Sequence, residues 1–334
     1  MKRPWLAPLT PLYAAGLALR NLRIEHGWEP VRQLRWPVVS IGNLSTGGAG
    51  KTPLTIALAK ALTRRGLRVD VLSKGYGRQS QRSARVDPNG TAEEFGDEPL
   101  LIARQTGVPV YVARQRYDAG QLAETEPSDS EKSAMHLLDD GFQHRQLHRD
   151  IDILLLDSRD GRDSLLPAGN LREPLKAARR ATVIAIPAQD DAPQLEAALR
   201  AWGFEGPIWR LRRAMEVPPV DGPVAAFCGI ARPEQFFAGL EALGLQLAAR
   251  YAFPDHHRYT PAELQRFSDL ALEAGATAFI TTEKDQVRLG TLSASFPDPL
   301  PLKTASLRIE IEQEDEVIEW LVDRLTPLFG HPPL

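Results

Sequence analysis

Residues 38–52 read VVSIGNLSTGGAGKT, an apolar run followed by a glycine-rich turn and then by Gly-Lys-Thr at the start of a helical stretch. Glycines allow backbone N–H groups to surround phosphate oxygens, and a helix N-terminus adds partial positive charge. In such a loop Lys51 reaches the β- and γ-phosphates and Thr52 holds Mg²⁺. Ser45 stands where the usual pattern has glycine. We expect ATP or GTP to bind here, at Ser45, Thr46, Gly47, Gly48, Ala49, Gly50, Lys51 and Thr52.

Outward from this loop, apolar β-rich runs alternate with helical stretches, which indicates an α/β fold with a mostly parallel sheet. The expected strands of this first part are residues 37–41, 67–72, 109–112, 135–138, 151–156 and 182–186, and the expected helices are residues 53–65 and 116–124. Residues 126–132 are polar and are predicted to form a surface loop.

A second, smaller α/β unit is expected after residues 212–223, where the periodicity fades and prolines gather. Its expected strands are residues 224–227, 245–251 and 278–282, and its expected helices are residues 233–243, 261–274 and 314–328. We therefore predict an N-terminal amphipathic helix in residues 1–28, a P-loop NTPase domain of α/β/α type in residues 29–215, and a second α/β domain in residues 216–334. The last helix of the second domain could return to the first.

Two apolar strands end in aspartate, and either could supply a carboxylate to Mg²⁺. The first ends in Asp139 and Asp140, adjacent carboxylates before a turn, where hard oxygen ligands would lie. The second is less interrupted and ends in Asp157, which could instead cap the following loop. The pattern alone leaves both possibilities open.

The start of the chain differs in charge from the rest. Residues 1–35 carry six basic and two acidic side chains, a net charge of +4, which leaves -7 for the remainder. Thr10 is predicted to be the N-cap of a helix that has Pro11 at its first position. Its apolar residues recur at helical spacing, with Arg20 and Arg23 toward the other side; they are Leu12, Tyr13, Gly16, Leu19 and Leu22. This pattern is typical of a helix at a membrane surface, but it fits a helix packed on its own domain equally well.

Composition narrows the class of protein. The 334 residues are 43% hydrophobic and 25% charged, which is ordinary for a globular chain of about two domains. The single cysteine, Cys228, excludes an intramolecular disulfide and fits a reducing compartment. The net charge of -3 gives no sign of the basic surface that nucleic-acid binding needs, so we expect no such partner.

Six more short motifs follow the glycine-rich loop in order: residues 73–78 (SKGYGR), 96–99 (GDEP), 139–144 (DDGFQH), 171–174 (LREP), 253–256 (FPDH) and 282–285 (TEKD). Together with the loop, this set resembles the tetraacyldisaccharide 4′-kinase family, the lipid A 4′-kinases, from about residue 37 to residue 285. The family carries Ser or Thr at the position of Ser45, so that residue also agrees with the resemblance.

The resemblance implies a P-loop kinase that transfers the γ-phosphate of ATP to the 4′-hydroxyl of an acylated glucosamine disaccharide 1-phosphate. The product would be the bis-phosphorylated lipid A precursor. It also implies Mg²⁺ as cofactor, a peripheral location at the cytoplasmic face of the bacterial inner membrane, and an active site in the cleft between two α/β/α domains joined by a short β linker. We expect a monomer.

The resemblance also assigns residues. A sugar hydroxyl is a poor nucleophile, so a base that accepts its proton helps the reaction. Asp97 resembles that base, and His256 resembles the partner that orients and tunes it. The family motif places the histidine directly after aspartate, which selects His256 over His257.

The remaining assignments concern charge and the metal. Lys51 and Arg116 would supply positive charge, and Thr52 would hold Mg²⁺ together with Asp139 or Asp140. Gln143 matches a further nucleotide-binding position, and Glu173 matches a further metal position. The motif at residues 282–285 is given no role.

Two other classes of protein share parts of the pattern. A partitioning or switch ATPase that docks on membranes has a similar loop, but it carries a lysine just before the two glycines, where this chain has Thr46. A P-loop kinase for a soluble sugar or nucleoside would not need the amphipathic start.

Overall fold

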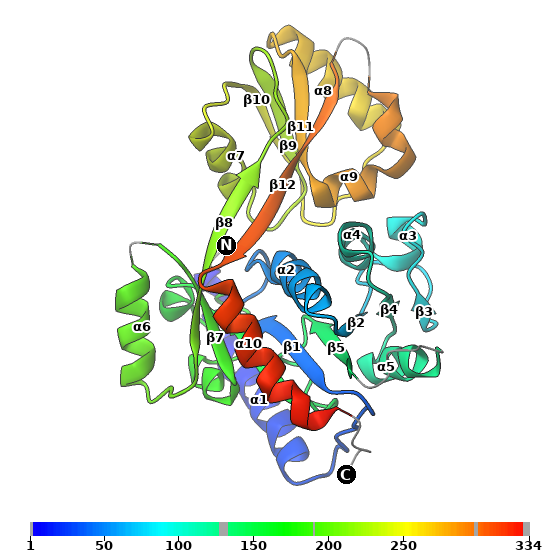
Figure 1. Cartoon of the computed structure of the whole chain (residues 1–334). Coiled ribbons are helices and arrows are strands. Elements are labelled where there is room, and N and C mark those ends of the chain that lie inside the picture. The colour runs from blue at the N-terminus through cyan, green and yellow to red at the C-terminus, as the bar shows by residue number, and fades with distance from the viewer. Residues whose placement is uncertain (1–2, 127–132, 190, 297–299, 330–334) are drawn as a thin grey trace.

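The computed structural model of the chain describes residues 3–126, 133–189, 191–296 and 300–329. Within these residues twelve strands form one sheet in the order β10-β9-β11-β12-β8-β7-β6-β1-β5-β2-β4-β3 (Figure 1). Most of the predicted loop at residues 126–132 lies outside the described residues. The α/β fold and its large, mostly parallel sheet are as predicted.

The glycine-rich loop leaves the middle of this sheet. The strands of this part are β1 (Val38–Asn43), β2 (Arg68–Ser73), β3 (Ala84–Arg85), β4 (Val110–Val112), β5 (Ala134–Asp139), β6 (Ile151–Leu155) and β7 (Val183–Pro187). Its helices are α2 (Lys51–Arg64), α3 (Ala92–Phe95), α4 (Asp97–Thr106), α5 (Arg116–Thr125) and α6 (Ala192–Ala201), with 3₁₀ turns at Asp160–Arg162 and Leu175–Arg180. β1 runs parallel to β5 and β6, with Ile41 opposite Asp139, so the loop and the Asp139 carboxylate leave the sheet at the same edge.

The second part of the chain continues the same sheet. Its strands are β8 (Ile208–Glu216), β9 (Val224–Cys228), β10 (Leu247–Ala252), β11 (Ala278–Thr282) and β12 (Leu302–Ile311). Its helices are α7 (Pro233–Ala242), α8 (Pro261–Glu273), α9 (Glu283–Leu289) and α10 (Glu314–Leu325), with 3₁₀ turns at Gly290–Ser295 and Thr326–Leu328. β8 pairs antiparallel with β12, and these two long strands connect the upper and lower parts of the molecule in Figure 1. Residues 212–216, at the start of the segment where we expected a domain boundary, belong to β8.

The apolar core has separate centres in the lower and upper parts of the molecule. We call β1–β7 with their helices the first lobe, and β9–β11 with α7, α8 and α9 the second lobe. Val39, Leu58 and Leu137 are buried in the first lobe, whereas Phe227 and Phe279 are buried in an aromatic cluster of the second. Val287 of α9 packs into the core cluster of the first lobe, so α9 joins the two.

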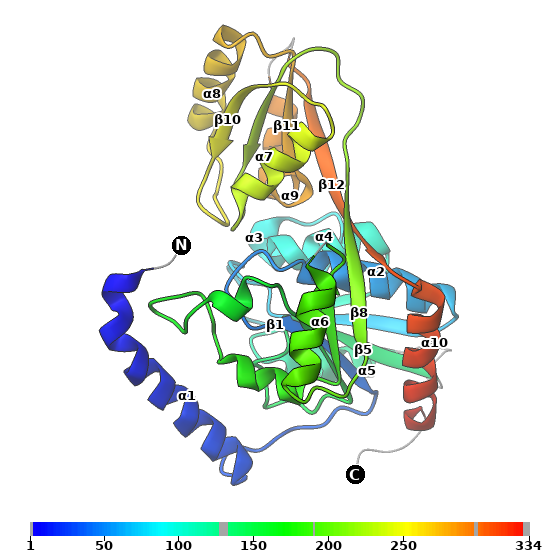
Figure 2. The same cartoon turned by 90° about the vertical axis from the view of Figure 1, so that its left-hand side faces the viewer.

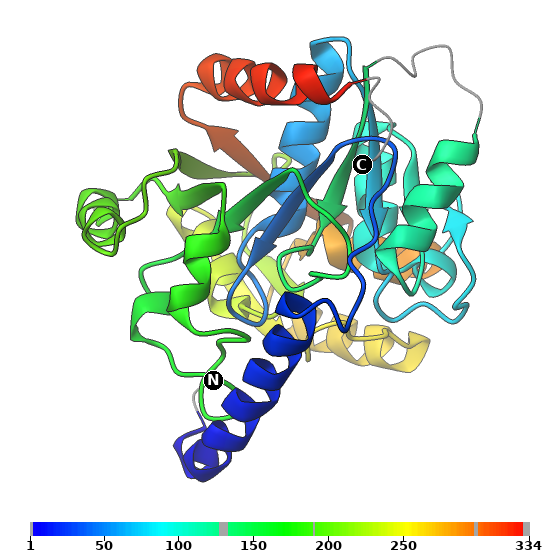
Figure 3. The same ribbon diagram turned by 90° about the horizontal axis from the view of Figure 1, so that it is seen from below.

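The first and the last described helices both lie on the first lobe (Figure 2). α1 (Thr10–Glu25) follows a 3₁₀ turn at Pro4–Leu9 and runs along one side of the lobe (Figures 2 and 3). Its N-cap is Leu9 rather than the predicted Thr10, because the preceding turn already supplies helical backbone. α10 returns to α2, where Arg64 pairs with Glu314 at 2.6 Å. Among the described residues, no helix has both the length and the apolar character that crossing a bilayer requires.

Candidate active site

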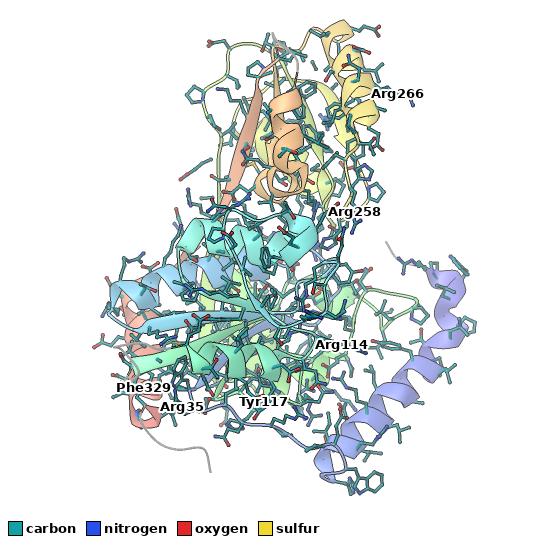
Figure 4. The ribbon with its side chains drawn as sticks, turned by 90° about the vertical axis from the view of Figure 1, so that its right-hand side faces the viewer. Arg35, Arg114, Tyr117, Arg258, Arg266 and Phe329 are labelled. Atoms are coloured by element: carbon teal, nitrogen blue, oxygen red, sulfur yellow. The ribbon has the colours of Figure 1, made fainter. Side chains whose placement is uncertain are left out.

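A cleft of about 1080 Å³ lies between the two lobes. One wall is formed by the glycine-rich loop, the end of β5 and residues that follow β2, and the other by residues of the second lobe such as Ile230 and His256. Arg258 of the second lobe donates to the Gly77 carbonyl of the first at 3.2 Å. Figure 4 shows Arg258 on the second lobe above Arg114 on the first. The cleft is therefore made by both parts of the chain.

The glycine-rich loop has the backbone that its sequence requires. Gly47, Gly48 and Gly50 have φ of 75°, 59° and 93°, a region that residues with a Cβ rarely adopt. A Cβ on Gly47 would come within 2.6 Å of the Ala231 side chain, so the second lobe also closes on the loop. The loop ends where α2 begins, which directs the N-terminus of that helix toward the cleft.

Lys51 lies at the centre of a polar network. Its ammonium group donates to Asn43 Oδ1 at 3.0 Å and lies 3.5 Å from Asp140 Oδ1. Arg172 contacts both Asp140 oxygens, at 2.9 and 3.1 Å. Burial would raise the pKa of Asp140, but the charges of Lys51 and Arg172 outweigh it and hold that pKa well below its usual range. Lys51 and Arg172 thus neutralise the charge of Asp140, and Asp140 in turn positions both side chains.

Asp139, at the end of β5, is in the opposite situation. Its Oδ1 accepts a hydrogen bond from the Thr55 hydroxyl at 3.1 Å, whereas its buried Oδ2 has no hydrogen-bond partner in the described part of the chain. Burial and the nearby carboxylates of Glu98 and Asp140 raise the pKa of Asp139 to about 7. An oxygen of this kind fits a cation ligand.

No three His, Cys, Asp or Glu side chains among the described residues converge into a complete metal site. Mg²⁺ usually takes one or two protein carboxylates and completes its shell with water and phosphate. Asp157, the alternative carboxylate, is held by Arg159 and lies 3.5 Å from Arg232. It also accepts the backbone N–H of Arg159, so it caps the loop after β6.

Across the cleft, His256 and Asp97 form a pair. His256 Nδ1 lies 3.1 Å from Asp97 Oδ2, and the Tyr76 ring lies 5.0 Å from the imidazole. The hydrogen bond to Asp97 raises the pKa of His256. Burial would raise the pKa of Asp97, but the hydrogen bond from His256 and the charge of Arg288 hold it well below its usual range. His256 lines the cleft, whereas Asp97 is 4% exposed and lies behind it.

The other predicted site residues divide into two groups. Thr46, Arg116 and Gln143 line the cleft, and Arg116 reaches the Asp140 carbonyl at 3.5 Å. Ser45, Ala49 and Thr52 belong to the loop but lie outside the cleft wall, with Ser45 and Thr52 buried. Glu173 is not brought to the cleft: its carboxylate is buried and pairs with Arg180 at 2.9 Å.

The sequence analysis missed three residues that the structure places among these groups. Asn43 is the last residue of β1 and accepts from Lys51, which an apolar strand pattern does not reveal. Arg172 lies in the LREP motif, where the resemblance directed attention to its neighbour Glu173. Arg288 follows the TEKD motif and contacts Asp97 through two of its nitrogens, a long-range contact with no local signal.

Comparison with known proteins identifies the family. The family model for tetraacyldisaccharide-1-phosphate 4′-kinase (LpxK) matches residues 2–326. The chain belongs to this family. It is 39% identical to the tetraacyldisaccharide 4′-kinase of Koribacter versatilis strain Ellin345, over 94% of this chain and 97% of that protein. The corresponding kinase of Polaromonas naphthalenivorans strain CJ2 is 37% identical, over 99% and 94%.

The fold agrees with the same family. A crystal structure of LpxK from Aquifex aeolicus, in complex with ATP, matches with a TM-score of 0.73 and 33% identity, over 96% of this chain and 98% of that one. The chain is thus an enzyme, a kinase that phosphorylates the 4′ position of a tetraacyldisaccharide 1-phosphate in lipid A biosynthesis. The family resemblance predicted from the seven motifs is confirmed.

Proposed function

We propose that this chain takes the phosphate from ATP bound at the glycine-rich loop, and that His256 accepts the proton of the 4′-hydroxyl from the opposite wall of the cleft. The observation that carries the proposal is the placement of His256 on the cleft wall, with Asp97 behind its Nδ1. The crystallised relative from Aquifex aeolicus holds ATP, which supports ATP as the phosphate donor here.

The residues of the first lobe fit a nucleotide and its metal. Loop N–H groups and Lys51 would hold the phosphates, with Arg116 and Arg172 as further cations along the same wall. Thr52 and Asp139 would hold Mg²⁺, since Asp140 is already paired with Lys51 and Arg172. When bound, Mg²⁺ would neutralise negative charge on the phosphates. The pairing of Glu173 with Arg180 removes Glu173 from this proposed metal set.

The sequence resemblance gave the role of base to Asp97 and the role of orienting partner to His256. The geometry favours the opposite assignment. Asp97 Oδ2 already accepts from Arg288 and His256, and its depressed pKa makes it a weak base. His256 has a raised pKa and faces the cleft, so it can contact the hydroxyl. We infer that His256 takes the proton, and that Asp97 fixes the tautomer with Nδ1 protonated and stabilises the imidazolium.

This assignment predicts the pH dependence of the reaction. The acid limb of kcat/KM should report the deprotonation of His256 in the free enzyme. Because Asp97 raises the pKa of His256, the Asp97→Asn variant should lower that pKa and move the acid limb to lower pH, in addition to lowering turnover. A full kcat/KM profile for both proteins tests this. An acid limb that stays in place in Asp97→Asn would contradict the pairing.

We propose that α1 binds the membrane that contains the lipid substrate, at the cytoplasmic face of the bacterial inner membrane. One side of α1 contacts the first lobe: Tyr13 donates to the Arg172 carbonyl at 2.9 Å, and Arg20 donates to the Gln143 carbonyl at 2.5 Å. Its other side leaves Leu12 and Leu19 74% and 58% exposed, and Trp5 just before it is 75% exposed. Exposed apolar side chains beside a basic segment are typical of an interfacial helix.

The Leu12→Ser/Leu19→Ser variant should therefore bind anionic vesicles at least about tenfold more weakly, because each leucine contributes roughly 1.5–3 kcal/mol when fully buried in an apolar phase. Vesicle sedimentation measures the binding. The matched control is Leu270→Ser/Leu272→Ser, which removes two exposed leucines at the end of α8 and should bind as the wild type does. Equal binding of all three proteins would show that α1 is only structural.

We also propose that the two lobes act as two domains, with β8 and β12 as the connection between them. Their separate apolar clusters and the antiparallel β8–β12 pair support this division. α10 then belongs with the first domain, since Trp320 packs edge-on against Trp209 at 6.0 Å and Leu321 lies in the first lobe's core.

A further inference from the structure

Arg288, on α9 of the second lobe, reaches into the first lobe to contact Asp97. Its Nε donates to Asp97 Oδ2 at 2.7 Å, and its Nη2 donates to the same oxygen. Nη2 also lies 3.4 Å from His256 Nδ1. The Arg288 side chain is 6% exposed, so these contacts are made almost without water. A cation from one lobe thus holds the carboxylate of the other.

The other end of the same guanidinium is fixed within the second lobe. Nη1 donates to Asp285 Oδ1 at 2.9 Å and to the Gly229 carbonyl. Asp285 in turn accepts from the Gly229 N–H at 3.1 Å and from the Tyr259 hydroxyl at 2.9 Å. Asp285, the last residue of the TEKD motif, therefore holds the Nη1 end of the Arg288 guanidinium, while Nε and Nη2 contact Asp97.

The backbone that carries His256 rests on the same support. The Gly229 carbonyl that accepts from Arg288 also accepts the His256 N–H at 3.2 Å. His256 has φ of 59°, an uncommon conformation for a residue with a side chain, and such a conformation persists only where neighbours hold it. One planar side chain thus contacts Asp97 and the carbonyl that holds His256.

We propose that Arg288 is a positioning residue for phosphoryl transfer: it sets the Asp97 carboxylate under Nδ1 of His256 and so fixes the imidazole for the 4′-hydroxyl. This inference rests on the proposed role of His256. The planar fork of arginine suits the task, because it can bind a carboxylate and a carbonyl at once, whereas lysine offers a single point charge.

Several charged groups determine the electrostatics of this pair. α9 contributes Arg288, Lys284 and Asp285, α4 contributes Asp97 and Glu98, and the loop after β10 contributes Asp255, next to His256. Lys284 pairs with Glu98, whereas Arg288 contacts Asp97 directly. The positive charge of Arg288 opposes the effect of Asp97 on His256 and lowers the pKa of the imidazole.

The test compares Arg288→Met and Arg288→Lys with the wild type, using the full chain and kcat/KM profiles over pH. Arg288→Met removes the charge, so it should lower kcat at least tenfold and move the acid limb to higher pH, the opposite direction to Asp97→Asn. Arg288→Lys keeps the charge but cannot make all of the contacts. It should lower kcat while leaving the acid limb near its wild-type position and KM for ATP unchanged. Arg266→Met, an exposed position on α8 labelled in Figure 4, is the matched control.

A double mutant separates positioning from general stability. If Arg288 acts through Asp97, the Arg288→Met substitution should lower kcat by a much smaller factor in the Asp97→Asn variant than in the wild-type chain. If Arg288→Met lowers kcat equally in the wild-type and Asp97→Asn chains and leaves the acid limb in place, the proposal is overturned. If Arg288→Met fails to fold, Arg288→Lys decides: wild-type kcat in that variant would also overturn it. Wild-type turnover in His256→Ala would instead refute the proposed base, which is a separate failure.

Discussion

Replacing Lys51 with alanine is expected to lower kcat/KM by about 10²- to 10³-fold, the usual cost of losing a preorganised charge at a reacting group. The ammonium group of Lys51 lies beside the glycine-rich loop, on the cleft wall, and is held by Asn43 at 3.0 Å. Its removal takes away the cation expected at the transferred phosphate and leaves Asp140 with less compensation. Steady-state kinetics with ATP and the disaccharide lipid measure the loss.

The matched control for this variant is Lys60→Ala, which removes a lysine nine residues further along α2 and outside the cleft wall. It should keep turnover close to that of the wild type. A Lys51→Ala variant that also turns over near the wild-type rate would refute the assignment of the glycine-rich loop as the phosphate site.

The second large effect is expected at His256. The His256→Ala variant should lower kcat by about 10²- to 10⁴-fold, the range that general-base catalysis contributes. Its affinity for ATP should change little, because the glycine-rich loop and Lys51 lie on the opposite wall. Kinetics together with equilibrium nucleotide binding separate the two quantities. A variant that loses ATP affinity but keeps kcat would move His256 from the base role to the nucleotide site.

His257→Ala provides a control at the neighbouring position. His257 stacks on Phe253, with 4.7 Å between ring centroids, lies 3.3 Å from Glu263 and does not line the cleft. Its loss should affect stability more than turnover. Comparable losses of kcat in the two alanine variants would show that the loop conformation, rather than the imidazole of His256, is what matters.

Much of the fold could be predicted because its signals are local. The apolar runs located β1, β5 and β6 to within one or two residues at each end, and the glycine-rich turn placed the start of α2 to within two residues. The strands β8 and β12 were missed. β8 alternates apolar and charged residues, as in Trp209, Arg210 and Leu211, and it extends into the segment where gathered prolines predicted a domain boundary. The antiparallel β8–β12 pairing spans about 90 residues of chain and leaves no trace in either segment alone.

The candidate site shows the same limit. Residues in short motifs, such as Lys51, Asp139 and His256, could be predicted as site residues because their neighbours in sequence mark them. Arg288 was missed because its role depends on Asp97, 191 residues away, and on the packing of α9 against α4. The roles that we propose for Asp97 and His256 depend on which of the two side chains faces the cleft, and the short motifs that contain them do not show this.

The most direct test of the account is the transfer of label from γ-labelled ATP to tetraacyldisaccharide 1-phosphate dispersed in vesicles, with the position of the new phosphate determined on the isolated lipid. We predict label on the 4′-oxygen with the wild-type chain, little label with Lys51→Ala or His256→Ala, and near-normal label with His257→Ala. Label at another position of the disaccharide, or undiminished transfer by His256→Ala, would contradict the account.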